Sequence, residues 1–399
     1  MLTRDGRLLF LTRCTRLFAY GALSVVLVFY LTSLGLTASQ TGILLTLTLV
    51  GDTVVSFYLT TRADRIGRRR MLIVGALLMA AAGLAFAYTR NFVFLVVAGT
   101  LGVISPSGNE VGPFLPIEQA ALSHVVPGQA RTTVFAWYTL AGSFATAAGA
   151  LSGGALSHLL QQKALPVVES YRVVVLLYAV LGAALALLFT RLSPAAEVSE
   201  SGAGSLGIGR SRAVVLRLSG LFALDSFAGG FVVQSFAAYW FYLRFGVNPA
   251  TLGAIFFWAN VLAGISALLA TRLAARFGLV RTMVFTHLPS NILLILVPLM
   301  PSLPLATLVL LARFSISQMD VPTRQSYIMA VVGPEERSAA GGITGVARTI
   351  GAALAPVFAG FLYARPALMS VPFFIAGALK VLYDVLLYRG FAAVQPPEA

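Results

Sequence analysis

Long apolar runs recur along almost the whole chain, and they constrain its fold more than any other feature. They cover residues 8–36, 40–61, 71–88, 91–122, 132–157, 172–190, 214–243, 250–271, 282–300, 304–332, 338–363 and 371–389. Runs of this length can cross the hydrocarbon core of a bilayer as helices. None alternates like a barrel strand, and in lipid each backbone must satisfy its own hydrogen bonds. The pattern predicts an all-α membrane protein with twelve transmembrane helices.

The composition leads to the same fold class. Only 11% of the residues are charged and 58% are hydrophobic, whereas a soluble domain carries about 25% charged residues. The net charge of +14 does not indicate nucleic-acid binding, because the arginines lie in short loops and form no basic face with interleaved aromatics. Cys14 is the only cysteine, which excludes a disulfide framework and a thiolate metal site.

The arginines and lysines are distributed unevenly between alternate loops. One set of loops and helix ends holds eighteen of them and the opposite set holds five. Because cytoplasmic loops carry the excess of positive residues, both termini are expected in the cytoplasm. Lys163 and Lys380 are the only lysines, and this arginine-dominated usage favours a bacterial source. We therefore expect a bacterial inner (plasma) membrane protein.

The middle of the chain holds its longest polar stretch, residues 193–213, which is rich in Ser, Gly and Glu. It predicts a cytoplasmic linker between an N-terminal six-helix bundle, residues 1–192, and a C-terminal six-helix bundle, residues 214–399.

The two halves also resemble each other at a nearly constant offset. Three glycines recur 211 positions later: Gly35, Gly42 and Gly67 match Gly246, Gly253 and Gly278. At an offset of 207, Pro127 and Gly153 match Pro334 and Gly360. Both halves have the same orientation, so the pattern predicts parallel repeats related by a pseudo-two-fold axis along the membrane normal.

The loop after the second run carries a recognisable motif. Residues 60–69 read Thr-Thr-Arg-Ala-Asp-Arg-Ile-Gly-Arg-Arg. This resembles the G-x-x-x-D-R-x-G-R-R loop of the major facilitator superfamily, with threonine at the first position, and the likeness in organisation covers nearly the whole chain. The resemblance implies that Asp64, Arg65, Gly67 and Arg68 form a cytoplasmic gate. An acid placed beside a helix N-terminus gains from the helix dipole there.

A second motif lies in the fifth run, where residues 149–154 read Gly-Ala-Leu-Ser-Gly-Gly. This resembles the G-P-x-x-G-G motif of the drug/proton antiporters of the same superfamily, with Ala150 in place of proline. The resemblance implies export by exchange. The alternative is that these small residues only allow close helix packing.

Charged residues within the apolar runs concentrate in the first, fourth, seventh and tenth runs. They are Arg16, Glu110, Glu118, Asp225, Arg313, Asp320 and Arg324. A charge at a helix centre costs about 2.5–3.5 kcal/mol on insertion scales, so each one requires a reason. The resemblance implies that these four helices line a central cavity, and we add Tyr20 and Asn109 to the predicted cavity residues.

The fourth run is interrupted near its middle. Pro106 and Pro113 flank Asn109 and Glu110 there, and each proline frees a backbone carbonyl. Broken helices mark binding sites in many transporters. The alternative is a hinge that holds a locally satisfied glutamate.

Roles follow from the spacing of these charges. Asp320 and Arg324 lie four residues apart and are expected to pair. Asp225, Glu110 and Glu118 then remain as candidate proton carriers, with Asp225 first because it has no opposite charge within a helical turn.

Two further predictions concern residues outside those four runs. Lys380 and Asp384 also lie four residues apart and are expected to form a structural pair. The three histidines show no metal-ligand spacing, so we expect no metal site.

These observations favour a secondary active transporter that works by alternating access. The leading hypothesis is proton-coupled efflux of an amphipathic or drug-like solute by a functional monomer, with the proton gradient as energy source and no cofactor. The runner-up is uptake or facilitated transport of a small organic anion held by Arg16, Arg313, Arg324 and Arg348. Candidates of another class are a membrane-embedded receptor and a lipid-active enzyme. The chain is not expected to be an enzyme, because no nucleophile–base pair and no P-loop emerges.

A first prediction concerns Asp52 and Arg348, which lie at similar depth in the second and eleventh runs. We expect them to form a pair between the two halves that breaks in one transport state. Neutralising either residue should impair transport, and exchanging the two residues should restore it because the pair is then rebuilt. Flux in vesicles is the measurement. If the double exchange inserts normally and restores no flux, the pairing is wrong.

Overall fold

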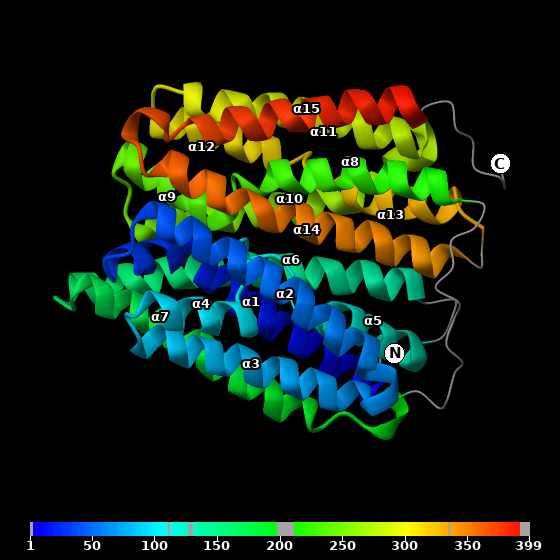
Figure 1. Cartoon of the computed structure of the whole chain (residues 1–399), viewed down its shortest axis with the longest axis horizontal. Helices are drawn as coiled ribbons and strands as arrows, with labels where there is room; N and C mark the ends of the chain where they lie inside the picture. The colour runs from blue at the N-terminus through cyan, green and yellow to red at the C-terminus, as the bar shows by residue number, and fades with distance from the viewer. Residues whose placement is uncertain (1–2, 111, 127–130, 198–210, 334–335, 392–399) are drawn as a thin grey trace. The chain divides into compact units, whose positions relative to one another are not determined.

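The computed structural model describes residues 3–110, 112–126, 131–197, 211–333 and 336–391. This part of the chain is helical and contains no strand (Figure 1). Its α-helices are α1 (Arg4–Ser33), α2 (Ala38–Ile66), α3 (Arg68–Tyr88), α4 (Phe92–Leu101), α5 (Phe114–Val125), α6 (Arg131–Gln162), α7 (Val167–Phe189), α8 (Arg212–Gly230), α9 (Gln234–Phe245), α10 (Pro249–Phe277), α11 (Leu279–Leu296), α12 (Leu303–Phe314), α13 (Asp320–Ala330), α14 (Arg337–Tyr363) and α15 (Val371–Phe391). Three short 3₁₀ turns are η2 (Pro194–Ala196), η3 (Val297–Leu299) and η5 (Pro366–Leu368).

The helices follow the predicted apolar runs, and the predicted membrane fold is confirmed. Ten helical spans in the described part are long and apolar enough to cross a membrane, and α4 and α12 are shorter apolar helices. The predicted interruption of the fourth run is present, because α4 ends at Leu101 and α5 begins at Phe114. The seventh and tenth runs were predicted as continuous helices, which is wrong. They divide into α8 with α9 and into α12 with α13.

Local residue chemistry explains both unexpected breaks. Helix α8 ends at the pair Gly229 and Gly230, and glycine is about 1 kcal/mol less favourable than alanine in a helix. After α12, the Ser315 hydroxyl donates to the carbonyl of Ala312 at 2.7 Å. Serine bonds of this kind compete with the helical ladder. Both signals are present in the sequence, but each is too weak to predict a break by itself.

The predicted repeat is visible in the backbone. Gly35 and its match Gly246 have φ angles of 97° and 64°, and Gly67 and its match Gly278 have φ angles of 115° and 85°. Gly67 separates α2 from α3, and Gly278 separates α10 from α11. Side chains disfavour this left-handed region, so glycine is needed at the same two turns of each repeat.

The chain divides into two compact units. The first spans Met1–Ser201 and Val233–Asn260, and the second spans Gly202–Val232 and Val261–Ala399. The first unit therefore includes α9 and the beginning of α10 besides α1 to α7. The predicted division into bundles at a linker of residues 193–213 stays a prediction, and residues 198–210 lie outside the described part.

Both described ends of the predicted linker are anchored. In the first unit, the Asp5 carboxylate accepts hydrogen bonds from the backbone and hydroxyl of Ser193. The Glu197 carboxylate accepts from the backbone N–H groups of Arg68 and Arg69, at 2.7 and 3.1 Å. Glu197 thus caps the N-terminus of α3, where a negative charge meets the positive end of the helix dipole. In the second unit, the backbone N–H of Ser211 donates to Glu336.

Helix α1 is the centre of the first unit and is buried along most of its length. It packs against α6 through glycines of the predicted antiporter motif. A Cβ atom on Gly149 would lie 2.0 Å from the carbonyl oxygen of Phe18, and one on Gly153 would lie 2.5 Å from that of Ala22. The next glycine, Gly154, contacts α10 in the same way. These positions therefore serve close packing between helices.

This packing predicts that Gly149→Ala destabilises the protein by about 1–3 kcal/mol, because the added methyl group overlaps the α1 backbone. Thermal unfolding in detergent micelles measures the loss. Gly220→Ala is the matched control, since a Cβ on Gly220 meets no atom within 4 Å. Equal stability of the two variants would contradict the packing described here.

Candidate functional site

A cluster of four charged side chains lies inside the first unit, and we call it the N-terminal charge cluster. Arg13 and Arg16 come from α1, Glu118 comes from α5, and Glu110 lies in the segment between α4 and α5. Glu110 lies 2.7 Å from Arg13 and 3.2 Å from Arg16. Glu118 lies 2.8 Å from Arg16, and both of these side chains are fully buried. Two positive and two negative side chains therefore neutralise one another.

Uncharged neighbours complete this cluster. The Glu118 carboxylate also accepts hydrogen bonds from the hydroxyls of Thr12 at 3.0 Å and Tyr138 at 2.5 Å. The guanidinium of Arg16 lies 4.6 Å from the ring centre of Phe114. Glu118 and Glu110 were predicted as candidate proton carriers with free charge. The structure instead places each of them in an ion pair, so the cluster has the features of a structural connection between α1, α5 and the interrupted segment.

The segment between α4 and α5 has backbone carbonyls that accept hydrogen bonds from neighbouring helices. The Tyr178 hydroxyl of α7 donates to the carbonyl of Val103. Ser235 of α9 donates to the carbonyl of Pro106 from its hydroxyl and its backbone N–H, at 2.5 and 3.1 Å. Packed helices of the first unit therefore satisfy both carbonyls, and neither is free for a ligand in this structure.

Two predicted cavity residues have contrasting positions. Tyr20 is fully buried and stacks on Tyr178, with ring centres 6.1 Å apart. Asn109 is exposed. The hydroxyl of Ser105 donates to the carbonyl of Asn109 at 2.7 Å, so this residue belongs to the local turn.

The predicted gate residues surround the turn between α2 and α3. Gly67 forms that turn, the Arg68 side chain is buried, and Arg65 is exposed. The side chain of Asp64 lies outside the described part, so the predicted gate stays a prediction. The acid that the structure places at this turn is Glu197, which the sequence analysis assigned to the linker.

A second cluster, the C-terminal charge cluster, lies in the second unit around Asp225 of α8. One oxygen of Asp225 lies 2.5 Å from Lys380 of α15, and the other lies 3.2 Å from Arg324 of α13. Arg324 also lies 3.1 Å from Asp320, which confirms the expected pairing of these two residues. All four side chains are buried. As predicted, Asp225 has no opposite charge within one turn of its own helix, but tertiary packing supplies two from other helices.

His287 of α11 also belongs to this cluster. Its Nδ1 atom lies 2.8 Å from Asp384 of α15, and its Nε2 atom lies 3.7 Å from Asp225. Asn291 donates to the other oxygen of Asp384 at 2.8 Å. The predicted pairing of Lys380 with Asp384 is therefore wrong, since each of them contacts a different helix. The sequence analysis named Lys380 and Asp384, but only as partners of each other. It did not predict His287 or Asn291 as site residues, because both lie on the ninth run, outside the four runs expected to line the cavity.

Three atoms of Asp225, His287 and Asp320 lie within 4.8 Å of one another, which is close enough to coordinate a metal ion. The Asp225 oxygens already contact Lys380 and Arg324. A divalent cation would have to displace two positive side chains, so the charges of the cluster disfavour a metal there.

The remaining predicted residues carry charges without a counter-charge in the described part. Arg313 lies in the last turn of α12, and Arg348 lies in the middle of α14. The Nε atoms of both are buried and donate to no protein acceptor in that part of the chain. Asp52 of α2 is also buried, and one of its carboxylate oxygens has no partner there. The predicted pairing of Asp52 with Arg348 stays a prediction, because the two belong to different units.

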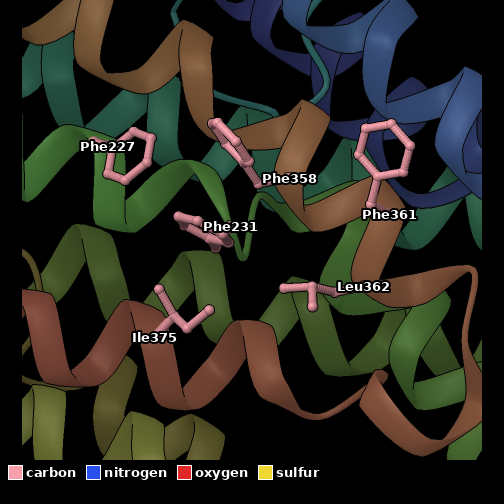
Figure 2. Close-up of a pocket in the computed structure, with 6 residues that line it drawn as sticks. All are labelled: Phe227, Phe231, Phe358, Phe361, Leu362 and Ile375. Carbon is pink, nitrogen blue, oxygen red and sulfur yellow. The ribbon is translucent and has the colours of Figure 1, made fainter.

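An apolar pocket of about 370 Å³ lies between α8, α14 and α15 in the second unit (Figure 2). Its lining residues are Phe227, Phe231, Phe358, Phe361, Leu362 and Ile375. The rings of Phe227, Phe231 and Phe358 contact one another edge-to-face or stacked. Phe358 and Phe361 are each 53% exposed, so this pocket is open at the surface of the second unit.

The geometry of the N-terminal charge cluster predicts an order of stability. Glu118→Gln should destabilise the protein by about 3–5 kcal/mol, because it leaves Arg16 with an incompletely paired charge in a fully buried site. Glu110→Gln should cost less, since Glu110 is partly exposed and Arg16 keeps Glu118. Chemical unfolding in mixed micelles gives both values. An equal or larger loss of stability in the Glu110 variant would show that Glu118 is not the main counter-charge of Arg16.

Comparisons with known proteins agree with this fold. The chain is 30% identical over 426 aligned residues to a yeast protein, the uncharacterized membrane protein YJR124C of Saccharomyces cerevisiae. That match covers 98% of this chain and 95% of the relative. A shorter match, 26% identical over 117 residues, relates 29% of the chain to 29% of the quinolone resistance protein NorA of Staphylococcus aureus.

A solved structure shows the same fold over the full length. It is a bacterial homologue of the human lysosomal transporter Spinster, in an inward-facing and occupied conformation. The TM-score is 0.76 at 16% identity, and the match covers 99% of this chain and 98% of that structure.

The family model of the Major Facilitator Superfamily matches residues 9–311 and 220–399. The charged loop between α2 and α3 and the paired repeats agree with this match, which covers nearly the whole chain. The protein is an integral membrane protein that belongs to the Major Facilitator Superfamily of transporters.

Proposed function

We propose that the protein is a proton-coupled secondary active transporter that exports a small amphipathic solute by alternating access. The observation that carries the proposal is the position of His287 between two buried carboxylates, Asp384 on one side and Asp225 on the other. We further propose that it works as a monomer in the plasma membrane with both termini in the cytoplasm.

The arrangement of these groups supports proton coupling. Imidazole can gain or lose a proton near neutral pH, and a carboxylate on each side can accept that proton or stabilise the charged ring. Asp225 also contacts Lys380 and Arg324. Adding a proton to Asp225 or His287 changes the charge balance of α8, α11, α13 and α15 together. In a low-dielectric interior, such a change can shift the balance between two conformations.

The nature of the solute is supported by other features. The aromatic pocket between α8, α14 and α15 suits an apolar group. The resemblance of the glycine motif on α6 to the antiporter motif favours export over uptake. The short likeness to the quinolone resistance protein NorA favours a drug-like solute. A second candidate, transport of a small organic anion, is favoured by Arg313 and Arg348, because neither has a carboxylate partner in the described part of the chain.

Flux measurements in proteoliposomes test the coupling. The protein is reconstituted with a pH dye inside the vesicles, and ethidium and naphthylacetate serve as an amphipathic cation and an amphipathic anion. For the wild type, addition of a transported probe should move protons, and a pH gradient should drive its accumulation. Asp225→Asn and His287→Gln should lose gradient-driven accumulation, because the proton path is broken. Both should keep exchange of labelled for unlabelled probe, which needs no net proton movement.

Glu169→Gln is the matched control, because Glu169 is a partly exposed carboxylate whose one ion pair among the described residues is with Arg172 of its own helix. It should transport like the wild type. Gradient-driven accumulation that survives in both the Asp225 and the His287 variants would overturn the proton-coupling proposal.

A further inference from the structure

The arginines of the membrane-spanning helices divide into two kinds. Arg16 and Arg324 each contact two carboxylates. Arg313 and Arg348 form no ion pair within the described part of the chain, although both belong to apolar helices of the second unit. The sequence analysis treated all four as equivalent, and tertiary packing separates them.

Hydrogen bonding at these two arginines is also incomplete. The Nε atom of each is buried and donates to no acceptor in the described part. Arg313 lies 4.9 Å from the ring centre of Phe314, a contact that shields the guanidinium but provides no oxygen. A guanidinium presents five N–H donors in a planar fork and no acceptor, so it is completed by an acceptor-only group.

The carboxylates near these two arginines already form ion pairs with other cations. Arg313 and Arg348 both lie within electrostatic range of Asp225 and Asp320. The oxygens of Asp225 contact Lys380 and Arg324, and Asp320 also contacts Arg324. Arg348 is additionally repelled by Arg324. The surroundings of Asp225 are therefore electropositive.

A charge count expresses the difference between the two clusters. The N-terminal charge cluster has two arginines and two glutamates. With Arg313 and Arg348 added, the C-terminal charge cluster has four permanent cations, the other two being Arg324 and Lys380. The carboxylates there are Asp225, Asp320 and Asp384. One positive charge remains uncompensated when His287 is neutral, and two remain when it is protonated.

We propose that Arg313 and Arg348 bind the anionic group of the transported solute, and that this group is a carboxylate. A single monoanion would neutralise the excess charge, and its two oxygens match the fork of a guanidinium. This inference rests on the proposed transport function, because it names the chemical class of the solute that the second unit receives. The transported molecule is then an amphipathic organic anion, with an apolar body and an acidic head.

The competing partner for Arg348 is Asp52 of the first unit, with which the sequence analysis pairs it. That pairing would use Arg348 for the conformational change and leave no role for it in binding. It would also leave Arg313 unexplained, since no other carboxylate in the described part has a buried oxygen without a hydrogen-bond partner. The substitution of Asp52 therefore distinguishes the two roles.

The test measures equilibrium binding to the purified protein in detergent, by thermal stabilisation and by isothermal calorimetry. Naphthylacetate, naphthylacetamide and naphthylethylamine share an aromatic body and differ in having an anionic, a neutral or a cationic head. The wild type should bind the carboxylate most tightly. Arg313→Gln and Arg348→Gln should each raise its Kd by about 10- to 100-fold, which corresponds to about 1.4–2.8 kcal/mol.

Three controls make the result specific. Arg272→Gln removes an exposed arginine of α10 and should bind like the wild type. Arg348→Lys keeps the charge but not the planar fork, and should lie between the wild type and the glutamine variant. Asp52→Asn should bind the carboxylate at least as tightly as the wild type.

Several outcomes would overturn the proposal. One is equal or weaker binding of the carboxylate than of its amide and amine analogues. Another is unchanged affinity in both arginine variants while the unfolding temperatures without ligand match the wild type. A loss in Asp52→Asn as large as that in Arg348→Gln would assign Arg348 to Asp52 instead. The binding test applies no proton gradient, so its result is independent of the flux test. Carboxylate binding that depends on both arginines would support this inference even if the proton-coupling proposal failed. Proton-driven flux without such binding would support the coupling proposal and not this inference.

Discussion

A charged side chain on a membrane-spanning helix has no water to solvate it, so its counter-charge must come from the protein or from a ligand. This constraint determines how both units are built. In the first, Arg16 connects α1 to Glu118 of α5 and to Glu110 beside the helix break. In the second, Asp225 connects α8 to Lys380 of α15 and Arg324 of α13. Each unit thus contains a polar centre that joins helices far apart in the sequence.

The two centres differ in what they can do. The first is balanced, and uncharged donors complete it, so it resembles a fixed structural connection. The second holds an imidazole between two carboxylates and has more cations than acids around it. Groups that can exchange a proton and groups that can receive an anion therefore lie in the same unit. Such an arrangement allows solute charge and proton charge to influence each other through Asp225, over distances at which a low-dielectric interior screens weakly.

Backbone polarity follows the same rule as side-chain charge. The break between α4 and α5 exposes carbonyls that a continuous helix would have satisfied, and Tyr178 and Ser235 donate to them. At other places the backbones approach so closely that only glycine fits, as at Gly149 and Gly153 against α1. Hydrogen bonds to these carbonyls and close backbone packing at the glycines together hold α1, α6, α7 and α9 in one unit. The interrupted segment is therefore well supported by protein contacts in this structure.

The sequence by itself determined the membrane class, the positions of nearly all helices, the repeat and the pairing of Asp320 with Arg324. These properties depend on the lengths of apolar runs, on turn glycines and on contacts one helical turn apart, all of which are local along the chain. Only the tertiary structure decided which distant charges meet. In it, Lys380 pairs with Asp225 and not with Asp384, and His287 lies between two acids. Within the described residues, Arg313 and Arg348 pair with no carboxylate. The physical reason is that packing between helices decides which neighbours each side chain meets, and sequence spacing does not encode that packing.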